Sequence, residues 1–193
     1  FKHGFFTKMS SEINLSALTA KFNLNNSNCV LDQIHSNQIV FGSKTKEGTR
    51  LEADGMISDE NNQVLWIYTA DCMPILFADK RKRIVAAIHC GRKGLEKKII
   101  RNLVRIFDNF GTYRNDLLVA IGPAISKEHY LVDKMTLKEF YRKAENKHIT
   151  INLTKTEKDL CLSDSNHFKE QSLNQLDLKR SACRQLLKEN IPI

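Results

Sequence analysis

The 193-residue sequence lacks any apolar stretch long enough to cross a membrane. A membrane-spanning helix needs about 20 consecutive apolar residues, whereas the longest apolar runs here, such as 64–67 and 84–88, have the length of strands. No segment shows the basic, apolar and small-residue order of a secretory signal peptide. We therefore expect no membrane partner and a cytoplasmic location.

Cysteines are few and are not arranged in pairs. The five stand at positions 29, 72, 90, 161 and 183, without a C-x-x-C pair. An odd number without paired spacing is typical of reduced thiols rather than of a disulfide framework. This pattern also favours the cytoplasm.

Aromatic residues are scarce, at 8% of the chain, so there are few platforms on which nucleic-acid bases could stack. The net charge is nevertheless +8, from 30 basic and 22 acidic residues. The lysines are scattered, and the one dense basic run, Lys80–Arg83, lies between two strand-like segments. We interpret it as a solvated turn and expect no nucleic-acid partner, while an anionic small substrate fits the charge.

Common catalytic motifs are also missing. The sequence contains no phosphate-binding G-x-x-x-x-G-K, no dinucleotide-binding G-x-G-x-x-G, no G-x-S-x-G and no H-E-x-x-H. The length and the 41% of hydrophobic residues predict a single domain over residues 1–193 that needs no structural metal. A bound metal would therefore serve chemistry.

Periodicity divides the chain into strands and helices. Short apolar or β-branched segments predict strands at 29–35, 39–41, 64–69, 75–78, 84–89 and 117–121. An apolar stripe from Leu95 to Phe110 predicts one helix that ends near Gly111. Because most strands come early and most helices late, we expect an α+β fold.

Two further helices are expected later in the chain. Thr136 and Glu139 have capping-box spacing, and Leu176, Cys183 and Leu187 recur at helical intervals. The polar segment 146–171 between them is expected to be a mobile insertion.

Polar residues at the ends of strand-like segments form the candidate site. His35, Cys72 and His89 offer two imidazoles and one thiolate, a set that leaves one zinc position open for water or substrate. Taken singly, each has an ordinary alternative, a buried small cysteine or a hydrogen-bonded histidine. Separations of 37 and 17 residues are not a local zinc signature, so the residues alone leave open whether the three meet.

Several strings occur in a familiar order. They are His3-Gly4-Phe5-Phe6-Thr7-Lys8, Gln33-Ile34-His35, Ala53-Asp54-Gly55, Thr69-Ala70-Asp71-Cys72-Met73-Pro74, His89-Cys90-Gly91-Arg92-Lys93-Gly94 and Ile121-Gly122-Pro123-Ala124-Ile125. The chain resembles the YfiH-type laccase-domain family over about residues 3 to 132.

The resemblance implies a single domain built as a four-layer α/β/β/α sandwich with mixed sheets. It implies a metal site at His35, Cys72 and His89, for which we expect zinc rather than copper because two imidazoles and a thiolate are a typical zinc set and no H-x-H pair is present. It also implies purine nucleoside phosphorylase activity, which splits adenosine, inosine or methylthioadenosine with phosphate, accompanied by adenosine deaminase activity. The partners would then be a nucleoside and phosphate.

If the chain is such an enzyme, we expect roles for single residues. Catalytic roles fall on Asp71, Cys72 and His89, with Asp71 as a proton shuttle whose alternative is a structural carboxylate that caps a turn. Substrate or phosphate binding falls on Lys8, Asn14, Gln33, Arg92 and Lys93. The family has tryptophan and arginine where this chain has Arg92 and Lys93, and a lysine holds phosphate as a point charge.

Three alternatives stay open. A copper polyphenol oxidase could use Met73 as an axial ligand, although the six histidines include no H-x-H pair. A hydrolase could use Cys72 as nucleophile and His89 as base. The altered histidine motif also fits a degenerate, non-catalytic domain. The physiological substrate, the metal and the oligomeric state are not fixed by the sequence.

Overall fold

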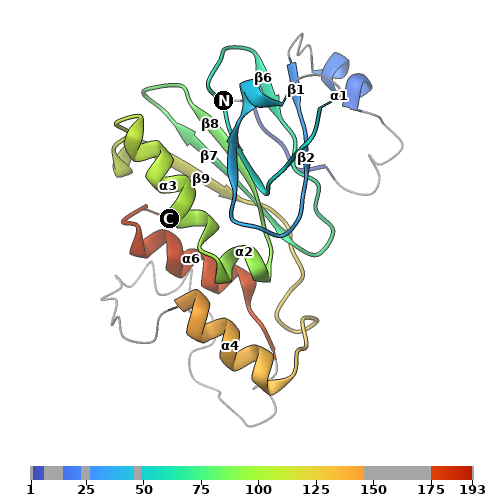
Figure 1. Cartoon of the computed structure of the whole chain (residues 1–193), viewed down its shortest axis with the longest axis vertical. Helices are drawn as coiled ribbons and strands as arrows, with labels where there is room; N and C mark the ends of the chain where they lie inside the picture. Colours follow the sequence, from blue (N-terminus) through green and yellow to red (C-terminus); the bar gives the residue numbers. More distant parts are fainter. Residues whose placement is uncertain (1, 7–14, 23–26, 46–48, 146–174, 193) are drawn as a thin grey trace.

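A mixed five-stranded sheet forms the centre of the computed structural model, which describes residues 2–6, 15–22, 27–45, 49–145 and 175–192 (Figure 1). In sheet order its strands are β3 (Ile39–Phe41), β5 (Gly55–Ile57), β8 (Val85–Cys90), β7 (Met73–Asp79) and β9 (Leu117–Ile121). β3 pairs with β5 in parallel, and the other pairs are antiparallel. Lys8, Asn14 and the segment 146–171 lie outside the described residues.

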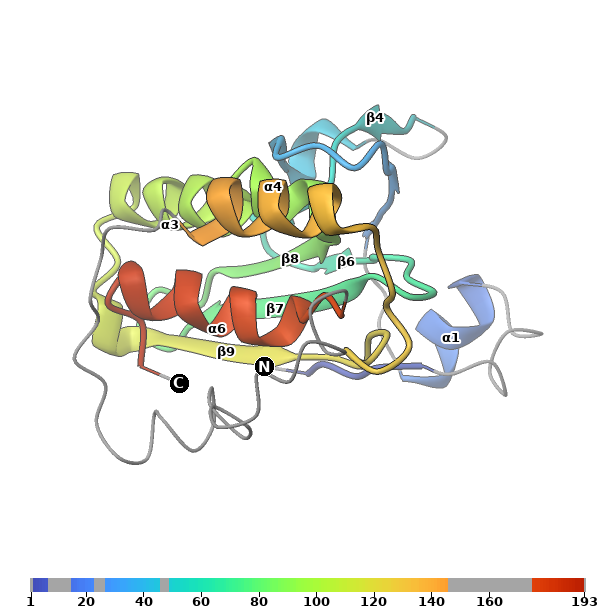
Figure 2. The same cartoon turned by 90° about the horizontal axis from the view of Figure 1, so that it is seen from below.

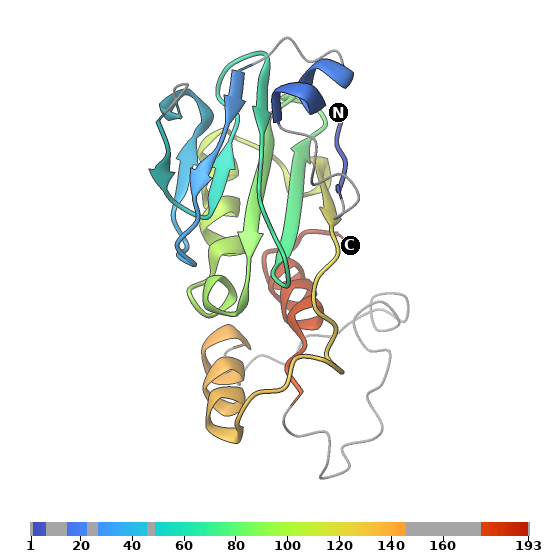
Figure 3. The ribbon, with the colours of Figure 1, turned by 90° about the vertical axis from the view of Figure 1, so that its right-hand side faces the viewer.

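Two short parallel pairs accompany this sheet. β1 (Ser27–Cys29) pairs with β6 (Gln63–Leu65), and β2 (Leu31–Asp32) pairs with β4 (Leu51–Glu52). Figures 1 and 3 place them at the end of the molecule away from α4 (Lys134–Glu145), with the short helix α1 (Leu15–Lys21) nearby.

The remaining helices pack against one another, and α4 lies beyond the end of the large sheet rather than over its face (Figures 1 and 3). They are α2 (Arg92–Glu96), α3 (Ile99–Asn109), α4 and α6 (Leu178–Lys188) (Figure 2). Two short 3-10 turns, η2 (Gly42–Lys44) and η3 (Arg114–Asp116), lie in the connections. No helix in the described ranges is long and apolar enough to cross a bilayer.

The alternation of side chains along the strands separates two hydrophobic cores. In β5, Ile57 packs into the large core between the sheet and the helices, whereas its neighbour Met56 packs into a smaller core with Cys29 and Leu31. Successive side chains of a strand point to opposite faces of a sheet, so adjacent residues can serve different cores. The apolar stripe of α3, including Phe107, closes the large core.

All six predicted strand segments contain strands. The bounds of β3 and β9 match the prediction, β7 is longer than predicted at both ends, and the other bounds differ by a few residues. The sequence reading missed β4 and β5, which have two and three residues. These segments are too short for period-two alternation to stand out. The prediction of helices combined with a mixed sheet is confirmed, and the four-layer arrangement stays a prediction.

The predicted single helix from Leu95 to Gly111 is in fact two helices. Lys98 has a positive φ of 63°, which ends α2 before α3 begins. The apolar stripe continues across the break because both helices bury the same side in the large core. A hydrophobic pattern therefore cannot reveal a single left-handed residue.

The other helix starts also differ from the sequence reading. Asp133, not Thr136, caps α4, because its carboxylate accepts the Thr136 amide at 2.9 Å. Glu139 instead pairs with Arg142 and Lys143. Leu176 precedes α6, whose cap is Asp177, a residue that accepts the amide of Arg180 at 2.8 Å.

The basic run Lys80–Arg83 forms the turn between β7 and β8, as expected. The Lys80 ammonium lies 3.7 Å from the Asp116 carboxylate, and the Arg81 guanidinium lies 3.6 Å from it. This run follows the end of β7, whereas Cys72 precedes its start. The basic side chains of the run therefore pair with Asp116 at a distance from the candidate ligands.

Candidate metal centre

Three segments that are distant in sequence bring the candidate ligands together. His35 lies in the loop after β2, Cys72 lies immediately before β7, and His89 lies within β8. Their ligand atoms are all within 4.8 Å of one another. The two imidazole rings meet edge to face, with centroids 4.7 Å apart. The structure thus supplies the convergence that the spacing left open.

The geometry fits a tetrahedral metal ion. Zinc binds sulfur at about 2.3 Å and nitrogen at about 2.0–2.1 Å, which places the two ligand atoms about 3.6 Å apart. The Cys72 Sγ lies 3.8 Å from the His35 Nε2. His89 is buried, Cys72 is half-buried and His35 is exposed, so three protein ligands would leave a fourth position accessible from solvent.

A glycine makes room for the thiol. Gly91 immediately follows β8, and a Cβ atom there would lie 2.6 Å from the Cys72 Sγ and 3.5 Å from the His35 Cδ2. A side chain at position 91 would therefore clash with the Cys72 thiol. The sequence analysis quoted Gly91 within a motif but gave it no role.

A buried carboxylate supports two of the three ligands. Asp54 is fully buried, and its Oδ1 accepts the His89 Nδ1 at 2.8 Å and the His35 amide at 3.0 Å. Its Oδ2 accepts the Ser36 amide at 2.5 Å, the Ser36 hydroxyl at 2.7 Å and the Ile34 amide at 3.3 Å. The sequence analysis quoted Asp54 within the motif Ala53-Asp54-Gly55 but gave it no role.

The pKa values of Asp54 and Cys72 are shifted in opposite directions. Burial would raise the pKa of Asp54, but the hydrogen bonds from His89, Ser36 and His35 outweigh it, and the pKa is lowered. Burial raises the pKa of the Cys72 thiol, and the carboxylates of Asp71 and Asp54 raise it further. Metal binding would therefore release a proton from Cys72.

The exposed ligand His35 is biased toward its neutral form. Desolvation lowers its pKa, and the neighbouring charges of His89, Lys93 and Lys97 lower it further, against the opposing carboxylate of Asp54. A neutral imidazole is the form that binds a metal. Lys97, which the sequence analysis did not single out, also donates from Nζ to the His35 carbonyl at 3.2 Å.

The predicted substrate-binding residues have different surroundings. Lys93 is exposed and close enough to His35 for its charge to affect that ring. Arg92 donates to Glu96 at 2.5 Å within α2. Gln33 holds Tyr68, donating to its carbonyl at 2.7 Å and accepting its amide at 2.9 Å. In this structure Gln33 joins two loops beside the centre.

Asp71 is exposed, next to Cys72, and its backbone carbonyl accepts the Ile125 amide at 2.9 Å. This bond ties the loop before β7 to the segment after β9. The carboxylate itself is near enough to raise the pKa of the Cys72 thiol.

The model of the family described as multi-copper polyphenol oxidoreductase laccase matches residues 8–191. The chain belongs to this family. The description of the family refers to copper, whereas the described residues bring together one group of three potential ligands.

Two relatives of this laccase-family chain carry the name purine nucleoside phosphorylase. One, from Rickettsia prowazekii, is 36% identical over 151 residues, which cover 78% of this chain and 61% of that protein. Another, from Synechocystis, is 42% identical over 87 residues, which cover 45% of this chain and 33% of that protein. The chain thus spans less than two thirds of the length of either.

Solved structures show the same fold. A Neisseria meningitidis protein of the DUF152 family aligns with a TM-score of 0.70 at 22% identity, over 96% of this chain and 68% of that one. YlmD from Geobacillus stearothermophilus aligns with a TM-score of 0.69 at 24% identity, over 91% of this chain and 63% of that one.

Met73 gives no support to the copper alternative. It follows Cys72 directly, but its side chain is fully buried in the large core among the sheet and helix residues. An axial copper ligand would have to face the same side as Cys72. The hydrolase alternative gains no support either, because the pKa of the Cys72 thiol is raised, which makes the nucleophilic thiolate less available.

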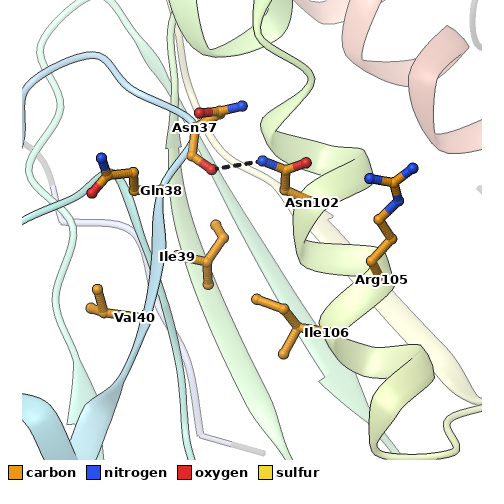
Figure 4. Close-up of a pocket in the computed structure, with 7 residues that line it drawn as sticks. All are labelled: Asn37, Gln38, Ile39, Val40, Asn102, Arg105 and Ile106. Carbon is orange, nitrogen blue, oxygen red and sulfur yellow. Dashed lines mark hydrogen bonds between the residues drawn. The ribbon is translucent and has the colours of Figure 1, made fainter.

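A shallow hollow of about 400 Å³ lies between β3 and α3 (Figure 4). Its lining consists of Asn37, Gln38, Ile39, Val40, Asn102, Arg105 and Ile106. The Asn102 side chain crosses one end of it and donates to the Asn37 carbonyl at 3.1 Å. None of the three candidate ligands lines it, so the hollow is separate from the metal centre.

Proposed function

We propose that this chain is a zinc-dependent purine nucleoside phosphorylase. The observation that carries the proposal is the convergence of His35, Cys72 and His89 with the spacing of a three-ligand site. Relatives named purine nucleoside phosphorylase support the reaction class. The net charge of +8 suits an anionic co-substrate.

His35, Cys72 and His89 would hold the metal. When bound, zinc supplies a Lewis acid that polarises an oxygen ligand in its open position. We favour zinc over copper because the sequence has no H-x-H pair for a multicopper cluster and because Met73 faces the large core.

Cations beside the centre would bind phosphate. Lys93 is exposed near His35 and can approach a phosphate as a point charge. Arg92 has five guanidinium donors, of which its contact with Glu96 uses Nη1. Lys8 and Asn14 complete the proposed set from the part of the chain that the structure does not describe.

In the proposed reaction a phosphate oxygen forms a bond to the ribose C1′ while the bond from C1′ to the purine nitrogen breaks. The bonding electrons leave with the base, which takes up a proton. Asp71 would relay that proton from dihydrogen phosphate to the base, because it is exposed beside Cys72. Gln33 would act by holding the loop at Tyr68, which leads along the chain to Asp71 and Cys72.

The test is chromatography of adenosine incubated with zinc-loaded protein, with and without phosphate. We expect adenine only when phosphate is present. The Cys72→Ala variant should lose bound zinc and adenine formation together, whereas Cys183→Ala, which removes a buried thiol from α6, should keep both.

Other products would point elsewhere. Inosine formed with or without phosphate would mean that water attacks the purine, and the activity would be deamination rather than phosphorolysis. Zinc retained by Cys72→Ala would refute the ligand assignment. Bound zinc without any product would refute the phosphorylase and favour a degenerate domain.

A further inference from the structure

Asp54 is a charged group without access to water, and all its hydrogen bonds are directed at the metal centre and its loop. Its side chain is 0% exposed. A buried carboxylate is costly unless hydrogen bonds satisfy its oxygens. The donors come from four residues, and two of those residues are the proposed ligands His35 and His89.

The contact with His89 fixes which ring nitrogen carries the proton. An ionised carboxylate only accepts hydrogen bonds, so the His89 Nδ1, at 2.8 Å from Oδ1, must be the protonated nitrogen. The lone pair is then on Nε2, the nitrogen left for a metal. Metal-binding histidines commonly donate their other N–H to a carboxylate, which sets their tautomer and orientation.

The contacts with the loop fix the backbone of His35. His35 has a φ of 56°, an uncommon conformation for a residue with a side chain. The consecutive amides of Ile34, His35 and Ser36 all donate to Asp54, so the loop curls around the carboxylate. The His89 amide also donates to the Asp54 carbonyl at 2.7 Å, which holds β8 against the same residue.

We propose that Asp54 is the positioning residue of the metal centre, which sets the His89 tautomer and holds the His35 loop in the ligating conformation. The proposal rests on the ligand set of the proposed function. It assigns the orientation of two ligands to one residue, while Cys72 is oriented independently at the start of β7.

The deciding variant is Asp54→Asn, which keeps the shape but replaces one accepting oxygen by a donating NH₂. Oδ2 accepts three donors from Ile34 and Ser36, so the amide oxygen should take that side. The NH₂ then faces the His89 Nδ1, which must accept, and the ring proton moves to Nε2. This blocks the metal-binding nitrogen, as a wrong tautomer does in other carboxylate–histidine pairs.

Two measurements that do not depend on enzyme activity test the effect of Asp54→Asn on the metal centre. Zinc affinity, measured by competition with a chromophoric chelator, should fall about 10- to 100-fold. The ¹⁵N spectrum of histidine-labelled metal-free protein should show the His89 proton on Nδ1 in the wild type and on Nε2 in Asp54→Asn. A purely structural role for Asp54 would leave the tautomer unchanged.

Asp79→Asn is the matched control. Asp79 is also a buried carboxylate, and it accepts the Arg81 and Lys82 amides at 2.8 Å and the Thr112 hydroxyl at 2.6 Å. It ends β7 away from Cys72, so its variant should lose thermal stability but keep the zinc affinity and the His89 tautomer of the wild type.

The outcomes separate this proposal from the proposed function. Wild-type zinc affinity in Asp54→Asn, or a His89 proton on Nε2 in the wild type, would overturn the assignment of Asp54. If Asp54→Asn does not fold, Ser36→Ala is the second variant, because it removes the hydroxyl donor to the Asp54 Oδ2. It should lower zinc affinity while His89 keeps its proton on Nδ1. An unchanged zinc affinity in Ser36→Ala would also overturn the assignment of Asp54. A wild type that binds zinc but forms no adenine refutes the phosphorylase alone, and a wild type that binds no zinc refutes both.

Discussion

At the scale of the residue, the metal centre depends on the absence of a side chain as much as on the ligands. Gly91 has a φ of −88°, which any residue adopts, so its role is to leave space rather than to relieve strain. The space is occupied by the Cys72 thiol, whose Sγ would lie 2.6 Å from an added Cβ. Such a contact is too short to persist, so one of the two groups must move.

Replacement of Gly91 by alanine should therefore displace Cys72 without changing the fold. We expect the zinc affinity to fall by about tenfold or more, the size of effect seen when groups that support a metal centre are lost. Chelator competition measures it, with Gly4→Ala as control because a Cβ at Gly4 would meet Phe6 at an ordinary 3.7 Å. Equal zinc affinity in Gly91→Ala and wild type would contradict this prediction.

At the scale of the element, the hairpin of β7 and β8 sets the register that brings Cys72 and His89 to one end of the sheet. Pro74 lies opposite His89, and Ala78 lies opposite Val85. The far end is closed by Asp79, which binds the turn amides and the Thr112 hydroxyl beyond α3. The turn and the helix end are therefore held by one carboxylate.

Acid should weaken this hairpin through protonation of Asp79. Burial alone would raise the pKa of Asp79, but hydrogen bonds from Thr112, Lys82 and Arg81 outweigh it, and the pKa is lowered. A carboxylate with a lowered pKa in the folded state stabilises the protein above its unfolded pKa of about 3.9 and loses that contribution as the pH falls.

Asp79→Asn should therefore be less stable than the wild type at neutral pH, and its stability should decline less steeply below about pH 4. Urea unfolding between pH 7 and pH 3 measures both effects. The two proteins should converge at low pH, where the wild-type carboxylate is protonated. Parallel curves over the whole range would contradict the role of Asp79.

At the scale of the whole molecule, the helical layer supports the metal centre through α2. Gly91 caps the start of α2 beside Cys72, and the Leu95 carbonyl in α2 accepts from the Gln185 side chain at 2.9 Å. The same Gln185 Nε2 donates to the Ala144 carbonyl near the end of α4 at 3.0 Å. One buried amide of α6 thus joins three helices.

Gln185→Leu should loosen that junction. The Leu95 and Ala144 carbonyls keep the hydrogen bonds that they accept from Lys98, and the substitution also removes the buried Gln185 Oε1, which has no partner among the described residues. We therefore expect a loss of about 1 kcal/mol, or about 2–4 °C in Tm. Thermal unfolding measures it, and Lys179→Leu, on the exposed side of α6, serves as the control for the new leucine. A Tm equal to that of the control would show that Gln185 contributes no net stability.

The sequence predicted the local elements well where periodicity was long enough to read. The stripe of α3 and the β-branched runs of β7, β8 and β9 are examples. It missed β5, whose Gly55 and Ile57 reveal a strand only through pairing with β3 and β8. It also merged α2 with α3, because one left-handed lysine leaves the hydrophobic pattern intact.

The sequence by itself determined the chemical inventory of the candidate site and the apolar patterns that produce a mixed sheet under a helical layer. Both follow from residue types and from the periods of strand and helix. Only the tertiary structure decided that His35, Cys72 and His89 meet, that Gly91 makes room for the thiol, and that Asp54 contacts both the His89 ring and the His35 backbone. These facts depend on strand register and on loops folded around a buried charge, which are contacts between residues far apart in the chain and leave no local pattern.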